Sequence, residues 1–448
     1  MSQDSIHDVV GVGFGPSNLA LAIALDEALR QRGAALSHHF VEKQPGFTWH
    51  GGMLLPDSDM QISFLKDLVS LRDPTSPLTF VNYLHQKGRL EAFINRKTFF
   101  PSRVEFNDYL GWVAARFAEH CSYGEEVAAV EPETAQGIVT GLRVRSRTAS
   151  GGETVRRAHN LVVATGGSPR IPAAFAQLRG DPRVFHSSAY LDRIHGLGLA
   201  RKPSARMAVV GGGQSAAEIT LDLHGRFPQL GIDLIFRGHA LKPSDDTPFV
   251  NEIFNPGFTD YVFGQGEAQR DAIIREFRNT NYAVVDADLI ERIYDILYQQ
   301  SVQGAPRLAL CGRSEVAEAE AAADGIGLTL RDGIAGTAGR RGYDAVVLAT
   351  GYERDGGRRL LSALAPWIED FTVDRDYRLR TRPEFRPQIH LQGQSETSHG
   401  LSDTLLSVLA VRSQEIAESL LAAKRRRGAG PDLHHAPAPL RRLAVNDD

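Results

Sequence analysis

The chain has 448 residues, of which 42% are hydrophobic and 23% are charged, so it is long enough to bury two or three domain cores. A formal net charge of −4 gives no general attraction to nucleic acid or to an anionic membrane. The two cysteines, Cys121 and Cys311, form no Cys-x-x-Cys pair. This disfavours a flavin disulfide reductase and a thiolate metal site, and it fits a reduced, cytoplasmic setting.

The first predicted elements form a dinucleotide-binding signature. A short apolar strand at residues 8–12 runs into a glycine-rich turn and then into a helix at residues 16–31. Glycines there let the backbone approach a pyrophosphate, which the helix N-terminus then holds. Because the strand begins at about Asp8 and charges interrupt the long apolar runs, we expect neither a targeting segment nor a transmembrane helix. The residues of the turn are Gly11, Gly13, Gly15 and Pro16.

Glu42 ends the next predicted strand, at residues 38–42. An acid at this place normally bonds the adenosine ribose hydroxyls. Glu42 follows Pro16 by 26 residues, slightly more than the usual spacing of about 20. An ordinary exposed glutamate is the alternative, but the order of strand, glycines and helix favours the ribose contact.

A second signature begins at about Arg206, after a segment at 44–110 without Rossmann alternation and a buried strand at 161–167. An apolar strand runs into a second glycine-rich turn, followed by a helix at 214–226 and a strand at 233–237. Arg237 ends that strand where an acid would bind the ribose of NAD(H), so we favour the 2′-phosphate of NADP(H). The residues of the turn are Gly211, Gly213, Gln214 and Ser215.

Two such signatures in one chain indicate a flavin enzyme reduced by a pyridine nucleotide. We therefore predict an α/β fold with two Rossmann-like dinucleotide-binding domains and a small, mainly helical substrate region. The later elements are a helix at 286–300, a buried strand at 343–352 and a helix at 403–424; the sequence of 313–341 is uninformative, and a solvated tail follows from about 424. The predicted boundaries are 1–190 with 340–448 for FAD, and 200–339 for NADPH, with 240–300 contributing the substrate region.

Five motifs in this order resemble the N-hydroxylating flavin monooxygenases of siderophore biosynthesis, in particular the L-ornithine N-delta-monooxygenases of the pyoverdine type. The resemblance covers about residues 7–425. The motifs are Gly-Val-Gly-Phe-Gly-Pro-Ser-Asn, Gln-Ile-Ser-Phe-Leu-Lys-Asp-Leu, Gly-Gly-Gly-Gln-Ser-Ala-Ala-Glu, Asn-Thr-Asn-Tyr and Asp-x-x-x-Leu-Ala-Thr-Gly-Tyr.

The resemblance also implies the roles of individual residues. A lysine is a point-charge partner for a substrate carboxylate, and an asparagine offers both a donor and an acceptor. A helix beginning at Ser402-Asp403 would direct its positive end at the flavin, and Ser407 on that helix would face the site. Implied for the flavin are Trp49, His50 and Gln61; for NADPH, Gln214, Ser215, Arg237 and Tyr282; and for ornithine, Lys66, Asn251 and Asn281.

The activity implied by the resemblance is hydroxylation of the side-chain amine of L-ornithine with FAD, NADPH and O2, through a flavin C4a-hydroperoxide. The sequence leaves the same reaction on L-lysine open, because one methylene changes selectivity by only about 1–3 kcal/mol. The substrate motifs disfavour a related flavin enzyme that carries out Baeyer–Villiger or sulfur oxidation. The intact glycines of both signatures disfavour a non-catalytic nucleotide-binding redox protein. We expect no nucleic-acid partner and no metal, and a homo-oligomer is compatible with the sequence.

Overall fold

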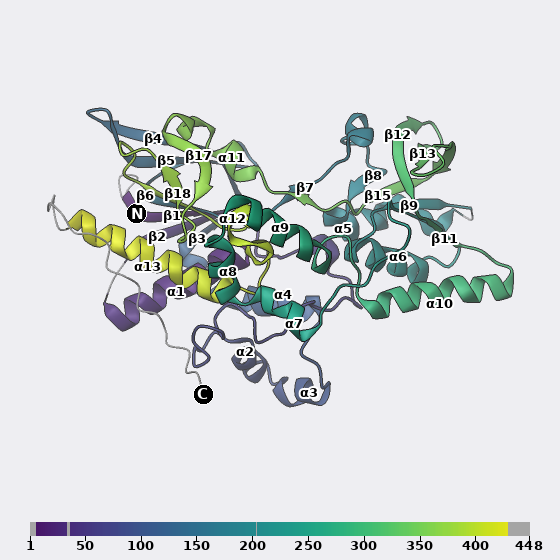
Figure 1. The fold of residues 1–448 in the computed structure, drawn as a ribbon, viewed down its shortest axis with the longest axis horizontal. Helices are drawn as coiled ribbons and strands as arrows, with labels where there is room; N and C mark the ends of the chain where they lie inside the picture. The colour runs from purple at the N-terminus through teal and green to yellow at the C-terminus, as the bar shows by residue number, and fades with distance from the viewer. Residues whose placement is uncertain (1–5, 34–35, 203, 429–448) are drawn as a thin grey trace.

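The computed structural model describes residues 6–33, 36–202 and 204–428. Two lobes, each built on a β-sheet, lie side by side and are joined by extended segments that include β7 at Ser168–Pro169 (Figure 1). The predicted α/β class is confirmed, and both lobes contain the parallel strands typical of dinucleotide-binding domains. In the part of the chain that the structure describes, no helix is both long and apolar enough to cross a membrane.

The first sheet has the strand order β3-β2-β1-β6-β5-β4, with β19 also paired to β6. Its core strands β2, β1, β6 and β19 run parallel, whereas β5 and β4 continue from β6 as an antiparallel ribbon. The strands are β1 Ile6–Val12, β2 His38–Glu42, β3 Cys121–Tyr123, β4 Glu125–Ala135, β5 Ile138–Thr148, β6 Glu153–Val163 and β19 Gln388–Leu391.

Helices α1, α4 and α13 cover one face of this sheet. Helix α1 is buried up to Ala28 because its small and aliphatic side chains pack between the sheet and the other two helices, and its last turn is exposed. The predicted first strand and helix are therefore confirmed to within two residues at either end. The helices of this lobe are α1 Pro16–Arg32, α2 Phe80–Gln86, α3 Leu90–Asn95, α4 Arg103–Ala114, α11 Gly356–Leu360, α12 Glu396–His399 and α13 Leu409–Gly428; a small hairpin adds β17 Ile368–Val373 and β18 Leu379–Thr381.

The second sheet is wholly parallel, in the order β11-β10-β9-β15-β8. Helices α5, α6 and α10 pack on one face and the antiparallel sheet β12-β13-β14 packs on the other. Helix α6 occupies the predicted residues, 214–226. The elements are α5 Tyr190–Ile194, β8 Val184–His186, β9 Arg206–Val210, α6 Gln214–Arg226, β10 Gly231–Ile235, α10 Ala287–Gln303, β11 Leu308–Cys311, β12 Ser314–Ala322, β13 Gly325–Asp332, β14 Ala338–Tyr343 and β15 Ala345–Leu348.

The second lobe extends beyond the predicted boundaries of 200–339. Strands β8 and β15 lie outside that range, but both belong to the second sheet because β15 pairs with β9 on one side and with β8 on the other. Residues 313–341, which had no predicted structure, form most of the β12-β13-β14 sheet. The outer strands β12 and β14 are largely exposed and carry little apolar alternation, whereas β13 alternates Ile326, Leu328 and Leu330 on its buried face, a strand signal that the prediction missed.

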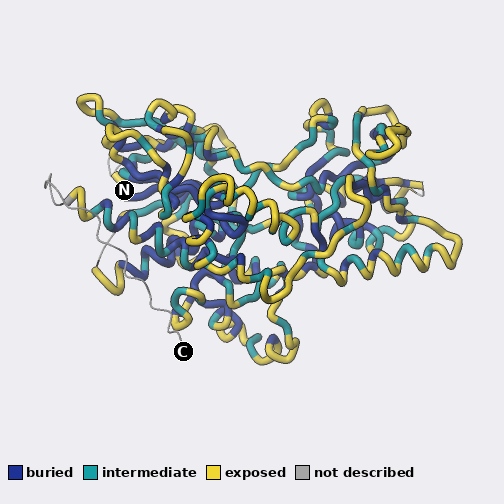
Figure 2. The backbone as a smooth tube through the Cα atoms, viewed as in Figure 1, coloured by how far each residue is buried: buried dark blue, intermediate teal, exposed yellow. Residues whose placement is uncertain are grey.

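The segment at 240–300 is helical, as predicted, and it lies between the two lobes in the centre of Figure 1, except for α10. Figure 2 shows that α10 projects from the second lobe with one buried edge and a largely exposed outer surface. The helices between the lobes are α7 Pro248–Asn251, α8 Pro256–Phe263 and α9 Glu267–Phe277.

The prediction of a final helix starting at Ser402-Asp403 was wrong. Residues Leu401–Thr404 form a short 3-10 helix, and α13 starts only at Leu409. Asp403 does not cap a helix, because its buried carboxylate accepts a hydrogen bond from the Ser395 N–H and pairs with Arg412 at 3.1 Å. Ser407 therefore precedes the helix, and most of the predicted C-terminal tail lies outside the described residues.

Candidate active site

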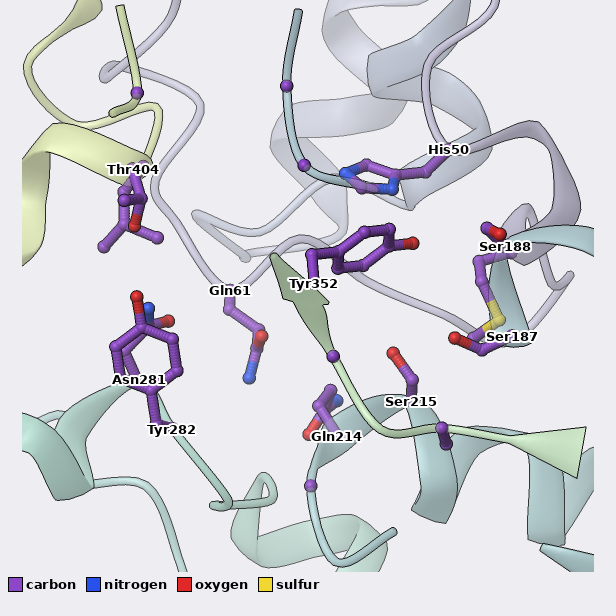
Figure 3. A pocket seen from close by; sticks show the side chains of 18 of the residues that line it. His50, Gln61, Ser187, Ser188, Gln214, Ser215, Asn281, Tyr282, Tyr352 and Thr404 are labelled. Atoms are coloured by element: carbon purple, nitrogen blue, oxygen red, sulfur yellow. The ribbon is translucent and has the colours of Figure 1, made fainter. Parts of the chain in front are cut away.

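A cavity of about 2820 Å³ lies where the parallel strands of both sheets end. It is lined by both glycine-rich turns and by residues of the segment between the lobes (Figure 3). A pocket for one small ligand is usually about 300–1000 Å³, so this cavity can hold several ligands together. Every predicted site residue except Gly11 lines it.

Gly13 and Gly15 form the first glycine-rich turn at the start of α1. Gly13 has a φ of +84°, and a Cβ there would lie 2.5 Å from the carbonyl oxygen of Ala164, so only glycine fits. A Cβ on Gly15 would meet nothing within 4 Å, because the cavity opens above it. Pro16 then begins the helix, and the free N–H groups of that first turn face the cavity side of the fold.

Gly11 does not line the cavity, so the prediction that it contacts a pyrophosphate finds no support in its position and stays a prediction. A Cβ at this position would lie 2.3 Å from Cδ1 of Phe40 and 3.1 Å from Nδ2 of Asn18. The glycine instead allows the helix and the neighbouring strand to pack closely on β1, one of the roles of glycine in this fold.

Glu42 lies at the carboxyl end of β2, beside the first turn. Its carboxylate accepts hydrogen bonds from the backbone N–H groups of Phe14, at 2.8 Å, and Gln44, at 2.9 Å. These two bonds fix the side chain at the edge of the cavity, where it has lone pairs left for a hydroxyl group.

Buried polar atoms near α1 lack partners among the described residues. They include Oε1 of Gln392 and the hydroxyl of Ser407, both on residues that line the cavity. The other polar atom of this amide, Nε2 of Gln392, donates a hydrogen bond to Oδ1 of Asn18 at 3.0 Å and so fixes the side chain. Because buried polar atoms are rarely left unpaired, this wall fits a bound group rich in hydroxyls and heteroatoms such as FAD.

His50 and Trp49 lie in a strained turn beside the cavity. His50 has a φ of +53°, which is uncommon for a residue with a side chain. Burial, aided by the positive charges of Arg103 and Arg354, lowers the pKa of His50 to about 4, so its ring is neutral near pH 7. Its ring centroid lies 6.2 Å from that of Tyr352. Figure 3 shows the two rings next to each other.

The second glycine-rich turn lies at the start of α6, as the first lies at the start of α1. Gly211 has a φ of +148°, and a Cβ would lie 2.2 Å from the carbonyl oxygen of Ala349. Gly213 is the N-cap of α6, and Ser215 follows in the first turn of that helix at the cavity wall. Arg237 is exposed two residues beyond β10 and lines the same cavity, where its charge can meet a phosphate.

Lys66 reaches the cavity from a tightly held loop. Burial lowers its pKa, and no acidic neighbour offsets that effect. The adjacent Asp67 is buried, and its carboxylate accepts bonds from the N–H groups of Val69 at 2.9 Å and Phe80 at 2.7 Å. The loop that carries the lysine is thus held by Asp67, and among the described residues no anion is paired with the Lys66 ammonium to stabilise its charge.

Asn251, Asn281 and Tyr282 come from the segment between the lobes. The Asn251 amide donates to the carbonyl of Asp246 at 2.7 Å, which leaves its own carbonyl oxygen free for a ligand. Tyr282 donates its hydroxyl proton to Glu396, and burial raises the pKa of both groups. Asn281 and Tyr282 lie together on one side of the cavity in Figure 3.

The charged residues around this cavity that sequence reasoning missed include Arg103, Glu218, Asp286 and Glu396. Glu218 lies within one of the motifs that carry the resemblance, so its position was a usable signal. The other three act through partners that are far away in the sequence, and no local pattern indicates such contacts.

Two sheets with parallel core strands, whose glycine-rich turns open on one cavity, define an oxidoreductase with two dinucleotide sites. The family model described as L-lysine 6-monooxygenase/L-ornithine 5-monooxygenase matches residues 5–354. The chain therefore belongs to this family.

Individual relatives cover nearly the whole chain. An L-ornithine N(5)-monooxygenase of Pseudomonas aeruginosa is 52% identical over 434 residues, or 97% of this chain and 98% of the relative. The solved ornithine hydroxylase PvdA of Pseudomonas aeruginosa has a TM-score of 0.90 and 53% identity, covering 94% of this chain and 100% of that one. The ornithine N-hydroxylase KtzI of Kutzneria sp. 744, solved with FADred, NADP+ and L-orn, has a TM-score of 0.87 and 41% identity, with coverages of 94% and 100%.

Proposed function

We propose that this protein is an FAD- and NADPH-dependent monooxygenase that converts L-ornithine to N-hydroxyornithine for siderophore or related natural-product biosynthesis. The observation that carries the proposal is one cavity in which both glycine-rich turns and an unpaired lysine meet. Family membership and the ornithine hydroxylases that resemble nearly the whole chain support the same activity.

FAD would be held by the first turn, with Gly13, Gly15 and Pro16 at the pyrophosphate and Glu42 at the ribose. Gln392 and Ser407 would offer it unpaired buried atoms, and Trp49, His50 and Gln61, which line the same cavity, would lie beside it. NADPH would be held at the start of α6 by Gly211, Gly213, Ser215 and Arg237, beside Tyr282. When bound, these cofactors supply the electrons and the oxygen-transfer chemistry.

The protein's own part is to bind, orient and desolvate the substrate. Lys66 would pair with the ornithine carboxylate, while the side-chain oxygens of Asn251 and Asn281 accept N–H bonds from its amino groups. An alkyl ammonium has a pKa near about 10.4, yet only the neutral amine can accept an oxygen atom. Low polarity around the side-chain amine would favour its neutral form.

A panel of three amines tests the proposal. With NADPH and O2, we expect hydroxylamine formation from ornithine at a kcat/KM at least roughly 10-fold above that for lysine, whose extra methylene shifts the reacting nitrogen. Putrescine, which lacks the carboxylate, should be a poor substrate. Equal or better use of lysine would instead favour a lysine hydroxylase, and no hydroxylamine from any amine would favour the non-catalytic alternative.

Arg237 should decide which nicotinamide nucleotide is used. Loss of a charged hydrogen bond costs about 1.5–3 kcal/mol, so Arg237→Ala should raise the KM for NADPH by roughly 10- to 150-fold and leave the KM for NADH nearly unchanged. Steady-state NADPH and NADH oxidation with ornithine measures both constants. Arg237→Lys keeps the charge, so its KM for NADPH should lie between those of the wild type and Arg237→Ala. A wild-type enzyme without preference for NADPH would contradict the assignment.

A further inference from the structure

A continuous set of hydrogen bonds connects the two lobes along the wall of the cavity. It runs through five side chains and crosses from one lobe to the other at two places. Figure 3 shows two of its members, Gln61 and Gln214, on neighbouring parts of the cavity wall. The five residues are Arg103, Glu218, Gln214, Asp286 and Gln61.

Asp286 makes the first crossing. Its Oδ1 accepts a hydrogen bond from Nε2 of Gln61 at 2.8 Å, and its Oδ2 accepts one from Nε2 of Gln214 at 2.8 Å. Its backbone N–H also donates to Oε1 of Gln214 at 2.9 Å. Gln61 belongs to the flavin side and Gln214 starts α6 on the NADPH side, so one carboxylate binds a residue from each nucleotide site.

Arg103 and Glu218 make the second crossing. The guanidinium at the start of α4 binds both oxygens of Glu218 on α6, at 2.9 and 2.7 Å. The side chains are only 13% and 4% exposed, so this pair is well shielded from solvent. Nε2 of Gln214 lies 3.1 Å from Oε1 of Glu218 and links the two crossings into one set.

Capping of its own helix does not explain the position of the Asp286 carboxylate. It occupies the N-cap position of α10, but it accepts no hydrogen bond there from the helix backbone. Burial raises its pKa, which means that the site stabilises the charge less well than water would. The two glutamine amides stabilise this charge from 2.8 Å each, and the Ser244 hydroxyl adds a longer hydrogen bond to Oδ1, at 3.4 Å.

We propose that Asp286 is a positioning residue that fixes the nicotinamide site relative to the flavin site by bonding Gln61 and Gln214 at once. This inference rests on the proposed function. Because Met53 and Leu55 pack into the core cluster of the second lobe, the lobes are already joined there. The bonds of Asp286 fix Gln61 and Gln214 locally beside that contact. Hydride transfer needs its donor and acceptor about 3–3.5 Å apart, and a displacement of about 1 Å costs on the order of 100-fold in rate.

The test compares holoenzymes of Asp286→Ala, Asp286→Asn and Asp295→Asn. Asp295 is an exposed acid on the same helix, so its replacement is the matched control. Anaerobic stopped-flow absorbance gives the limiting rate of flavin reduction and the NADPH concentration for half of that rate. A titration with NADP+ gives its Kd and the accompanying change in the flavin spectrum, a readout that needs no turnover.

Asp286→Ala should lower the limiting rate at least roughly 10-fold, change the half-saturating NADPH concentration and the NADP+ Kd less than about 3-fold, and weaken the change in the flavin spectrum. Asp286→Asn should recover much of the rate, because a rotated Gln61 amide can accept from the new NH2 group. Unchanged FAD content and thermal unfolding temperature identify a local effect. Asp295→Asn should behave as wild type.

An unchanged limiting rate in Asp286→Ala, or a change in NADP+ affinity alone, would overturn the inference. If that variant does not fold, Gln61→Ala breaks the same crossing from the other side and should show the same loss of rate. Where both fold, the double variant should lose little more than either single variant. A wild-type holoenzyme that NADPH does not reduce would overturn the proposed function instead.

Discussion

Replacing Lys66 by alanine should raise the KM for ornithine by roughly 100-fold, because the variant loses a partly buried charge that would bind the substrate carboxylate. The loop should keep its shape, since Asp67 rather than Lys66 holds it through backbone N–H bonds. FAD content and reduction by NADPH should therefore stay near wild type. Hydroxylamine formation over a range of ornithine concentrations, beside NADPH oxidation, measures the effect.

Two controls separate carboxylate binding from a general disturbance of the cavity. Lys66→Arg keeps the charge but changes its geometry, so it should recover part of the ornithine affinity. Putrescine has no carboxylate, and its weak turnover should be the same in wild type and Lys66→Ala. A normal dependence on ornithine in Lys66→Ala would remove this residue from the substrate site.

Gly211→Ala should abolish productive use of NADPH while FAD remains bound. A side chain at a φ of +148° is strained, and its Cβ would lie 2.2 Å from the Ala349 carbonyl oxygen, so the turn has to move. The strain alone costs on the order of 1–3 kcal/mol, and a shift of about 1 Å in the turn costs roughly 100-fold in hydride transfer. The rate of flavin reduction by NADPH measures this loss.

The matched control is Gly225→Ala, within α6 of the same lobe. A Cβ there meets nothing within 4 Å, so we expect normal flavin reduction and a gain of about 1 kcal/mol in helix stability. FAD should stay bound in both variants because its turn lies in the other lobe. Wild-type reduction of Gly211→Ala by NADPH would show that the second turn does not hold this nucleotide.

The parts of the fold that follow local patterns could be predicted from the sequence. Helix α6 covers residues 214–226 as expected, because a glycine turn marks its start and apolar periodicity its length. The start of α13 could not be predicted in this way. Ser402-Asp403 has the composition of a helix N-cap, but Arg412 and the Ser395 N–H engage the carboxylate from elsewhere in the fold.

The candidate site also combines residues that local sequence patterns predict with residues that only the folded chain brings together. Residues within the glycine turns were identifiable, because their backbone geometry depends on their neighbours in sequence. The close approach of Phe40 to Gly11 could not be predicted, since it depends on how β2 packs beside β1. The bonds from Asp286 to Gln61 and Gln214 span 225 and 72 residues, so only the folded chain brings these groups together.

Labelling with ¹⁸O₂ tests the central claim most directly. Purified holoenzyme, NADPH and ornithine under ¹⁸O₂ should yield hydroxyornithine that carries one labelled oxygen on its side-chain nitrogen, with one NADPH consumed for each product formed. Mass spectrometry locates the label, and absorbance gives the NADPH consumed. Unlabelled hydroxyornithine, or NADPH oxidation that yields only hydrogen peroxide in the presence of saturating ornithine, would contradict the assignment of this chain as an ornithine monooxygenase.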